Sequence, residues 1–201
     1  MRIIGLTGSI GMGKTETARM FARAGVPVFD SDAAVHALYA PGGAAVGPIL
    51  AAFPGTGSPG TGIDRSLLSK AVMSEPDAFR RLEAIIHPLV AAAQRDWLAA
   101  RRAEGAEFAL LDIPLLFETG GHTRCDAVVV VSAPPDVQRA RVLARPGMTP
   151  EKLDSILSKQ LADHEKRARA DFIIETDKGL AAAEADVHAV LARLRAADRG
   201  R

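Results

Sequence analysis

Short apolar runs bounded by turn residues recur along the chain, and the longer stretches between them carry apolar residues at helical spacing. Strands are predicted at residues 3–7, 27–30, 108–112, 127–132 and 171–175. Helices are predicted at residues 14–24, 32–39, 65–72, 76–86, 88–104, 135–145, 150–166 and 179–194. The run from Ala127 to Val131 is apolar at every position, which is typical of a central strand covered on both faces. Strands that alternate with helices in this way predict an α/β fold with a mostly parallel, five-stranded sheet.

Two excursions from this alternation are longer than a single crossover helix requires. Residues 31–107, between the second and third predicted strands, contain several predicted helices and indicate a helical subdomain. Within it, residues 41–62 are rich in Gly, Pro and Ala, typical of a flexible surface loop that either orders on ligand binding or has no role. The second excursion, residues 139–169, is unusually charged.

Composition and charge limit the classes of partner. The chain has 201 residues, 48% of them hydrophobic, and a net charge of +1, so no global field favours nucleic acid or an anionic membrane. No apolar run approaches the roughly 20 residues that span a bilayer. Met1 leads directly into the first strand, without room for a secretory signal, and the single cysteine, Cys125, excludes an internal disulfide. We expect a cytoplasmic protein with no nucleic-acid, membrane or obligate protein partner.

The strongest local motif follows the first predicted strand and is the run Gly8-Ser9-Ile10-Gly11-Met12-Gly13-Lys14-Thr15. It fits the Gly-x-x-x-x-Gly-Lys-Thr pattern of a phosphate-binding loop, and a predicted helix follows it. Backbone N–H groups and a helix N-terminus then converge where nucleotide phosphates bind. Lys14 is expected to reach the outer phosphates, and the Thr15 hydroxyl to ligate the accompanying magnesium. The motif predicts a protein that binds ATP or GTP.

Acidic residues follow the second predicted strand, in the segment Phe29-Asp30-Ser31-Asp32. In an open α/β sheet the carboxyl ends of the strands face the ligand crevice, so a carboxylate here can contact magnesium or accept a proton from an attacking hydroxyl. The alternative is local, because Asp30 or Ser31 can cap the helix that begins near Asp32. Both hold together if Asp30 or Ser31 is the cap and Asp32 points into the crevice.

The third predicted strand ends in an acid, Asp112. A hydrophobic strand ending in aspartate is typical of the second nucleotide motif, in which the carboxylate supports magnesium. A buried aspartate that caps the following turn is the alternative. The apolar residues after it, from Ile113 to Phe117, are candidates to line a pocket for an apolar part of a substrate.

Three arginines, Arg139, Arg141 and Arg145, lie on one predicted helix, with the last two at i,i+4 spacing. Guanidinium groups bind phosphate oxygens in a fork geometry. A mobile helical segment that carries them can close over the phosphates and exclude water, as a kinase lid does. The alternative is a solvated basic face paired with acids of the same segment, Glu151, Asp154 and Glu165. The phosphate loop favours the lid.

His87 precedes Pro88, which is expected to begin a new helix, so His87 is predicted at a helix junction. A histidine in such a position is more often structural than catalytic.

The motifs together resemble the dephospho-CoA kinase family along nearly the whole chain. The matching segments, in order, are residues 4–15, 30–36, 62–68, 82–88 and 112–118, then Gln138, Arg141, Arg145, Gln160 and residues 170–174. The run Asp112-Ile113-Pro114-Leu115-Leu116-Phe117-Glu118 is the most distinctive match. The sequence departs from the family pattern at Pro146, where an acidic residue often stands, and at Glu175-Thr176-Asp177, where the family has an asparagine.

The resemblance implies ATP-dependent phosphorylation of the ribose 3′-hydroxyl of dephospho-CoA, the last step of coenzyme A synthesis, with ATP and Mg²⁺ as cofactors. It implies a three-layer, phosphate-loop kinase-like fold with a core of residues 1–32, 106–137 and 170–201, a helical CoA-side subdomain at 33–105 and a helical lid at 138–169.

The resemblance also assigns roles to residues. Asp32 becomes the candidate that orients or deprotonates the 3′-hydroxyl. Lys14 and the loop residues 8–15 hold ATP, Thr15 and Asp112 hold the metal, and Arg141 and Arg145 neutralise charge in the transition state. The implied substrate-binding residues are Asp32, Arg81, His87, Pro114, Leu115 and Phe117.

Other functions fit less well. Another phosphate-loop kinase, acting on a nucleoside monophosphate or a metabolite, is the nearest alternative. A non-enzymatic, ATP-dependent switch that binds partners rather than a substrate is a lower alternative. The chain contains no asparagine, so it lacks the Asn-Lys-x-Asp guanine-reading motif of switch GTPases. A nucleic-acid-binding ATPase is disfavoured by the near-zero net charge.

Overall fold

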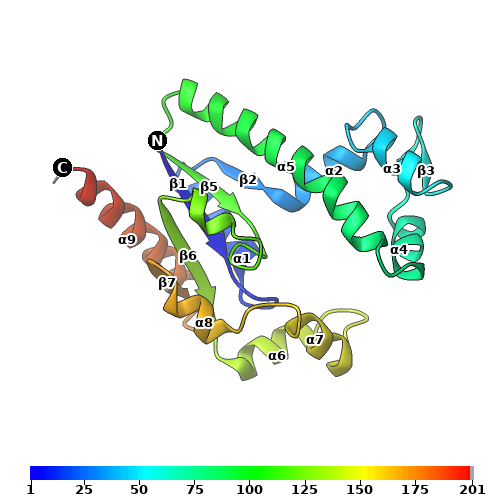
Figure 1. Ribbon diagram of the computed structural model, residues 1–201. Helices are drawn as coiled ribbons and strands as arrows, with labels where there is room; N and C mark the ends of the chain where they lie inside the picture. The colour runs from blue at the N-terminus through cyan, green and yellow to red at the C-terminus, as the bar shows by residue number, and fades with distance from the viewer. Residues whose placement is uncertain (200–201) are drawn as a thin grey trace. The chain divides into compact units, whose positions relative to one another are not determined.

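The computed structural model (Figure 1) describes residues 1–199. Its elements in chain order are β1 (Arg2–Thr7), α1 (Lys14–Arg23), β2 (Val28–Asp30), α2 (Ser31–Tyr39), α3 (Val46–Ala52), β3 (Gly57–Ser58), β4 (Gly62–Ile63), α4 (Arg65–Ser74), α5 (Ala78–Ala103), β5 (Phe108–Asp112), η1 (Gly121–Arg124), β6 (Ala127–Ser132), α6 (Pro135–Leu143), α7 (Pro150–Leu157), α8 (Asp163–Ala168), β7 (Phe172–Glu175) and α9 (Leu180–Arg199). All five predicted strands are present, as β1, β2, β5, β6 and β7.

These five strands form one sheet in the order β2-β5-β1-β6-β7, and β1 pairs in parallel with both β5 and β6. In the register of these pairs, Leu6 lies opposite Asp112 on one side and Val129 on the other. The carboxyl ends of the strands therefore meet at one edge, the edge at which ligands bind in open α/β sheets. The predicted α/β fold with a five-stranded parallel sheet is confirmed.

Side chains of β6 alternate between the two faces of the sheet, which explains why every position of this strand is apolar. Val129 and Val131 pack into a cluster with residues of α1 and α9, such as Phe21 and Leu191. Val128 and Val130 pack on the opposite face. Helices α1 and α9 thus cover one face of this part of the sheet, and the segment that follows β5 packs on the other.

The chain divides into two compact units, residues 1–28 with 104–201 and residues 29–103. The first unit contains the phosphate-loop motif and α6 to α9. The second contains α2 to α5 and the β3–β4 hairpin, and it has its own apolar core around Ile49, Phe53 and Leu68. The predicted subdivision at residues 33–105 and the predicted lid at 138–169 stay predictions. No helix among the described residues has the length and apolar character to cross a membrane.

The helix predicted to break at Pro88 is continuous, so the prediction of two helices, 76–86 and 88–104, is wrong. Proline inside a helix removes one hydrogen bond and costs about 3 kcal/mol or more. The apolar face of α5 offsets this cost, because Leu82, Ile86 and Leu89 follow helical spacing and pack into the core of the second unit. Full burial of an aliphatic side chain contributes roughly 1.5–3 kcal/mol. Ile86 is buried, and Leu82 and Leu89 are partly buried and add smaller contributions.

Two other predicted segments also differ. Residues 41–62 are not a structureless loop. They contain α3, in which Val46 and Ile49 are buried, then strand β3 and the first residue of strand β4. Gly62 has φ 78°, and a Cβ there would lie 2.4 Å from the carbonyl oxygen of Tyr39, so this tight turn requires glycine. The helix predicted at 150–166 is divided into α7 and α8 by residues 158–162.

Candidate active site

The phosphate-loop motif forms a turn between β1 and α1, as predicted. Gly11 and Gly13 have φ of 79° and 95°, a conformation that glycine adopts without strain. Met12 anchors the loop, since its side chain is buried and the Ala133 backbone N–H contacts its sulfur at 3.1 Å. The N-cap of α1 is Gly13, which supplies no side-chain cap, so the first N–H groups of this ten-residue helix can serve an anion.

Lys14 and Asp112 form an ion pair at the end of the loop. The Lys14 ammonium donates a hydrogen bond to the Asp112 carboxylate, and the two side chains are only 15% and 8% exposed. β1 and β5 are neighbours with Leu6 opposite Asp112, so the sheet itself brings the third-strand aspartate to the phosphate loop. Asp112 lies at the carboxyl end of β5 beside the phosphate-loop motif, and its role as a metal ligand stays a prediction.

Thr15 is exposed in the first turn of α1 and is the second predicted metal ligand. Among residues 1–199 no group of three or more His, Cys, Asp or Glu side chains forms a metal cluster. The residues nevertheless fit Mg²⁺, because this ion is usually held by one or two protein oxygens together with nucleotide phosphates rather than by an all-protein cage.

Arg141 is linked to the phosphate loop by hydrogen bonds that pass through Thr176. Its guanidinium donates two hydrogen bonds to Thr176, one to Oγ1 at 2.8 Å and one to the backbone oxygen at 2.7 Å. The Thr176 hydroxyl donates in turn to the Met12 backbone oxygen at 2.7 Å. Thr176, noted in the sequence only as a departure from the family pattern, therefore joins Arg141 to the loop.

The other two arginines of the predicted lid differ from Arg141. Arg139 Nη1 lies 3.6 Å from Asp154 Oδ1 on the surface, which is the solvated pairing offered as the alternative. Arg145 lies outside α6, which ends at Leu143, so the prediction that it shares a helix face with Arg141 is wrong. A proline disfavours helical geometry at the residue before it. Because Pro146 follows Arg145, the helix ends before Arg145.

Two glutamines contact the phosphate loop at a single residue, Ile10. Gln138 Nε2 donates to the Ile10 backbone oxygen at 2.7 Å, and the Ile10 N–H donates to Gln160 Oε1 at 3.1 Å. Both residues were part of the family resemblance, but no pattern in the sequence gave them a role. Gln160 lies between α7 and α8, where the predicted helix breaks.

Glu118 also contacts the residues between α7 and α8. It lies at the end of the segment that starts with Asp112. Its Oε1 accepts a hydrogen bond from the Leu161 N–H at 2.7 Å and lies 2.9 Å from the ammonium of the fully buried Lys166. Burial raises the pKa of Glu118, but the hydrogen bonds from Lys166 and from backbone N–H groups outweigh it and hold the pKa below its ordinary value. Glu118 therefore links the loop after β5 to α8 as an anion.

In the second unit, Asp30 is the cap of α2. Its Oδ1 accepts a hydrogen bond from the Ala33 N–H at 2.9 Å. Asp32 lies in the first turn of the same helix with its side chain exposed. The prediction that Asp30 or Ser31 caps this helix is confirmed for Asp30, and the role of Asp32 stays a prediction.

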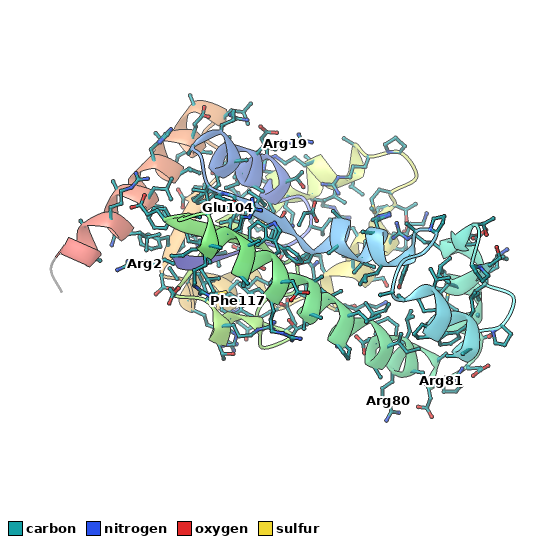
Figure 2. The ribbon with its side chains drawn as sticks, turned by 90° about the horizontal axis from the view of Figure 1, so that it is seen from above. Arg2, Arg19, Arg80, Arg81, Glu104 and Phe117 are labelled. Carbon is teal, nitrogen blue, oxygen red and sulfur yellow. The ribbon has the colours of Figure 1, made fainter. Side chains whose placement is uncertain are left out.

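Arg81 and His87 lie on α5. Arg81, labelled in Figure 2, donates to Glu75 Oε2 at 2.9 Å and lies over the ring of Phe53, 5.0 Å from its centre. His87 is exposed inside the continuous helix, 3.9 Å from Glu83, so its predicted place at a helix junction is wrong.

Of the apolar residues after β5, Leu115 is 37% exposed, whereas Phe117 is buried. The Phe117 ring (labelled in Figure 2) lies 5.2 Å from the His122 ring and packs against the sheet with Val128 and Val130. The Pro114 backbone oxygen accepts a hydrogen bond from Thr7 Oγ1 at 3.0 Å, which holds this segment against the end of β1.

Comparison with known proteins adds independent information. A family model described as dephospho-CoA kinase matches residues 2–182. A dephospho-CoA kinase from Mesorhizobium japonicum is 59% identical over 195 residues, which cover 97% of this chain and 98% of the relative. The crystal structure of TT1252 from Thermus thermophilus has a TM-score of 0.82 at 34% identity and covers 96% of this chain and 97% of its own. A dephospho-CoA kinase from Campylobacter jejuni shares the fold, with a TM-score of 0.73 at 23% identity over 98% of each chain.

Proposed function

Because the chain belongs to the dephospho-CoA kinase family, we propose that Lys14, Asp32 and Arg141 carry the catalytic roles of that family's reaction. The reaction is the ATP-dependent phosphorylation of the ribose 3′-hydroxyl of dephospho-CoA, which yields coenzyme A and ADP. The oxygen of this hydroxyl forms a bond to the γ-phosphorus, the bond between that phosphorus and the oxygen of ADP breaks, and the proton of the hydroxyl leaves.

ATP phosphates bind to the loop of residues 8–15 in this proposal. The support is the geometry of the loop, in which two glycines with positive φ and the uncapped N-terminus of α1 direct N–H groups outward. Lys14 supplies a positive charge to the outer phosphates, and Asp112 holds that ammonium in place. Positioning and charge neutralisation are the main contributions a protein makes to phosphoryl transfer.

Asp32 orients the attacking hydroxyl and accepts its proton. The support is that Asp32 follows a sheet strand at its carboxyl end and that Asp30, not Asp32, caps α2. The Asp32 carboxylate is thus available to a substrate hydroxyl.

Mg²⁺ accompanies ATP and is held by the Thr15 hydroxyl and the Asp112 carboxylate. When bound, it neutralises charge on the phosphate oxygens. Asp112, which accepts a hydrogen bond from the Lys14 ammonium, would then serve two cations, this ammonium and the metal.

Arg141 neutralises charge that develops on the transferred group, and Arg145 assists from the segment that follows α6. The two hydrogen bonds to Thr176 support the assignment, since they orient the Arg141 guanidinium beside the phosphate loop. Closure of residues 138–169 over ATP excludes water and favours transfer to the substrate over hydrolysis.

Substrate contacts are assigned to Asp32, Arg81, His87, Pro114, Leu115 and Phe117. Leu115 is the exposed apolar member and the better candidate for direct contact, whereas the buried Phe117 ring supports the segment from below. We further place the protein in the cytoplasm, where ATP and coenzyme A precursors occur, in keeping with the free thiol of Cys125.

The observation that carries these assignments is the Lys14–Asp112 pair at the end of a complete phosphate loop. The test is a coupled ADP-release assay with ATP and magnesium, in which dephospho-CoA is compared with nucleoside monophosphates, adenosine and no acceptor. Turnover that depends on dephospho-CoA, with the product phosphorylated at the ribose 3′ position, is expected. Turnover only with another acceptor would assign a different phosphate-loop kinase activity. ADP release without any acceptor would contradict the proposed closure of the lid.

A further inference from the structure

The two peptide groups that flank Ile10 form hydrogen bonds with the side chains of Gln138 and Gln160, which lie at the two ends of residues 138–160. Gln138, near the start of α6 and 8% exposed, donates its amide N–H to the Ile10 carbonyl oxygen. Gln160, just before α8, accepts the Ile10 N–H through its side-chain oxygen. A glutamine side chain carries both a donor NH₂ group and an acceptor oxygen. Gln138 donates through its NH₂ group to the Ile10 carbonyl oxygen, and Gln160 accepts the Ile10 N–H through its oxygen.

The geometry of a trans peptide connects the Gln138 contact to the phosphates. The C=O of Ile10 and the N–H of Gly11 belong to one planar group and point in opposite directions. A donor that fixes the Ile10 oxygen toward α6 therefore fixes the Gly11 N–H away from α6. Gly11 also lies tightly against this helix, because a Cβ at Gly11 would be 2.5 Å from Val142 Cγ2 and 3.1 Å from the Gln138 backbone oxygen.

The Gln160 contact acts on the preceding peptide. It occupies the Ile10 N–H, and the Ser9 carbonyl on the opposite side of that peptide accepts the Met12 N–H at 3.2 Å. The N–H groups of Ile10 and Met12 are therefore used inside the protein. Within residues 1–199 no protein acceptor is found for the Gly11 and Gly13 N–H groups, which can therefore serve an anion together with the first N–H groups of α1.

We propose that Gln138 and Gln160 are positioning residues that orient the peptides on either side of Ile10 so that the Gly11 N–H faces the phosphates of ATP. The inference rests on the proposed binding of ATP at this loop. Gln138 is the more important of the two, because its bond sets the peptide that contains the Gly11 N–H, whereas Gln160 acts one peptide away.

The chemistry of the two contacts provides a matched pair of variants. In Gln160→Glu a carboxylate oxygen still accepts the Ile10 N–H. In Gln138→Glu the donor is lost and a carboxylate faces the Ile10 carbonyl oxygen, which drives the peptide to rotate. Both variants add one negative charge beside the phosphate loop, so an effect of charge alone would be similar in the two, and only the roles of the hydrogen bonds differ.

The experiment measures steady-state kinetics with ATP and dephospho-CoA, the dissociation constant of ADP by calorimetry, and thermal unfolding. Gln138→Glu is expected to weaken ADP binding and raise the KM for ATP by about tenfold or more, with a change of less than about threefold in the KM for dephospho-CoA. Gln160→Glu is expected to lose at least about fivefold less ADP affinity than Gln138→Glu. If Gln138→Glu does not fold, Gln138→Met, which also lacks the donor but is uncharged, takes its place with the same expectation.

Equal losses of ADP affinity in the two glutamate variants would overturn the inference, since charge would then account for both. A lower unfolding temperature of the Gln138 variant with unchanged ADP affinity would also overturn it, because the contact would then be structural only. The two proposals fail differently. If the wild-type protein does not bind ADP or turn over dephospho-CoA, the proposed function fails; if it does and only the order of the variants is absent, the inference about Ile10 fails alone.

Discussion

Lys14 and Asp112 form an ion pair across two neighbouring strands, whose register places Leu6 opposite Asp112. The Lys14 ammonium, which we propose to contact ATP, is thus held in position by a carboxylate. Such preorganisation matters in phosphoryl transfer, where the protein contributes mainly fixed charges aimed at the transferred group.

Replacement of Lys14 by alanine is expected to lower kcat by at least about 100-fold, because the outer phosphates lose their fixed positive charge. The fold should remain, since the sheet and α1 are formed by other residues. Arg19→Ala is a matched control, because Arg19 is an exposed cation of the same helix, paired with Glu16 and labelled in Figure 2. Steady-state kinetics with circular dichroism decides the question, and a Lys14→Ala kcat within tenfold of wild type would remove the proposed role.

Asp30 and Asp32 are expected to respond in opposite ways to alanine substitution. Asp32→Ala should abolish transfer and leave the unfolding temperature unchanged, because the proton acceptor is removed and the cap is retained. Asp30→Ala should retain measurable transfer but lose about 1 kcal/mol of stability, the usual cost of an N-cap. Kinetics and urea denaturation of both variants test this. Normal turnover in a folded Asp32→Ala protein contradicts the assignment.

Alanine substitutions of Arg141 and Arg139 are also expected to have different effects on the rate of transfer. Arg141→Ala is expected to slow transfer by roughly 10² or more with a modest loss of ATP affinity, because this guanidinium is oriented toward the phosphate loop by Thr176. Arg139→Ala is expected to change kcat by less than about twofold, since its partner is the surface residue Asp154. Single-turnover rates measure the chemical step directly. Equal rates in the two variants would contradict the proposed role of Arg141 and favour the alternative, in which it belongs to a solvated basic face.

Glu118 predicts a pH dependence of stability. Burial raises the pKa of Glu118, but hydrogen bonds from Lys166 and from backbone N–H groups outweigh it, so the pKa in the folded protein lies below the ordinary value of 4.5. A carboxyl group of this kind stabilises the fold above its unfolded pKa, and the stabilisation is lost as the pH falls through the folded pKa. Glu118→Gln should therefore be less stable than wild type at neutral pH.

The difference between wild type and Glu118→Gln should shrink as the pH is lowered below about 4.5, because wild-type Glu118 then becomes protonated as well. Urea denaturation of both proteins at a series of pH values measures this difference directly. A difference in unfolding free energy that stays constant from neutral pH to acid would show that the Glu118 contact with Lys166 does not depend on ionisation.

Several features of the site were predicted from short stretches of sequence. The phosphate loop was recognisable because its glycines, lysine and threonine stand at fixed spacing within eight consecutive residues. The end of β5 at Asp112 was predicted because an apolar strand that ends in an acid is also a local pattern, and its role as a metal ligand stays a prediction. The same local reasoning was wrong at Pro88, where burial of the apolar face of α5 outweighs the helix-breaking tendency of one residue.

The sequence by itself determined the five strands, the fold class and the position of the phosphate loop, because these depend on the spacing of residues close together in the chain. The tertiary structure alone decided which residues support the loop. Gln138 and Gln160 reach Ile10 across 128 and 150 positions, and Thr176 reaches Met12 across 164. Hydrogen bonds over such separations leave no periodic pattern in the sequence. They form only because parallel pairing brings the carboxyl ends of β1, β6 and β7 to one edge of the sheet.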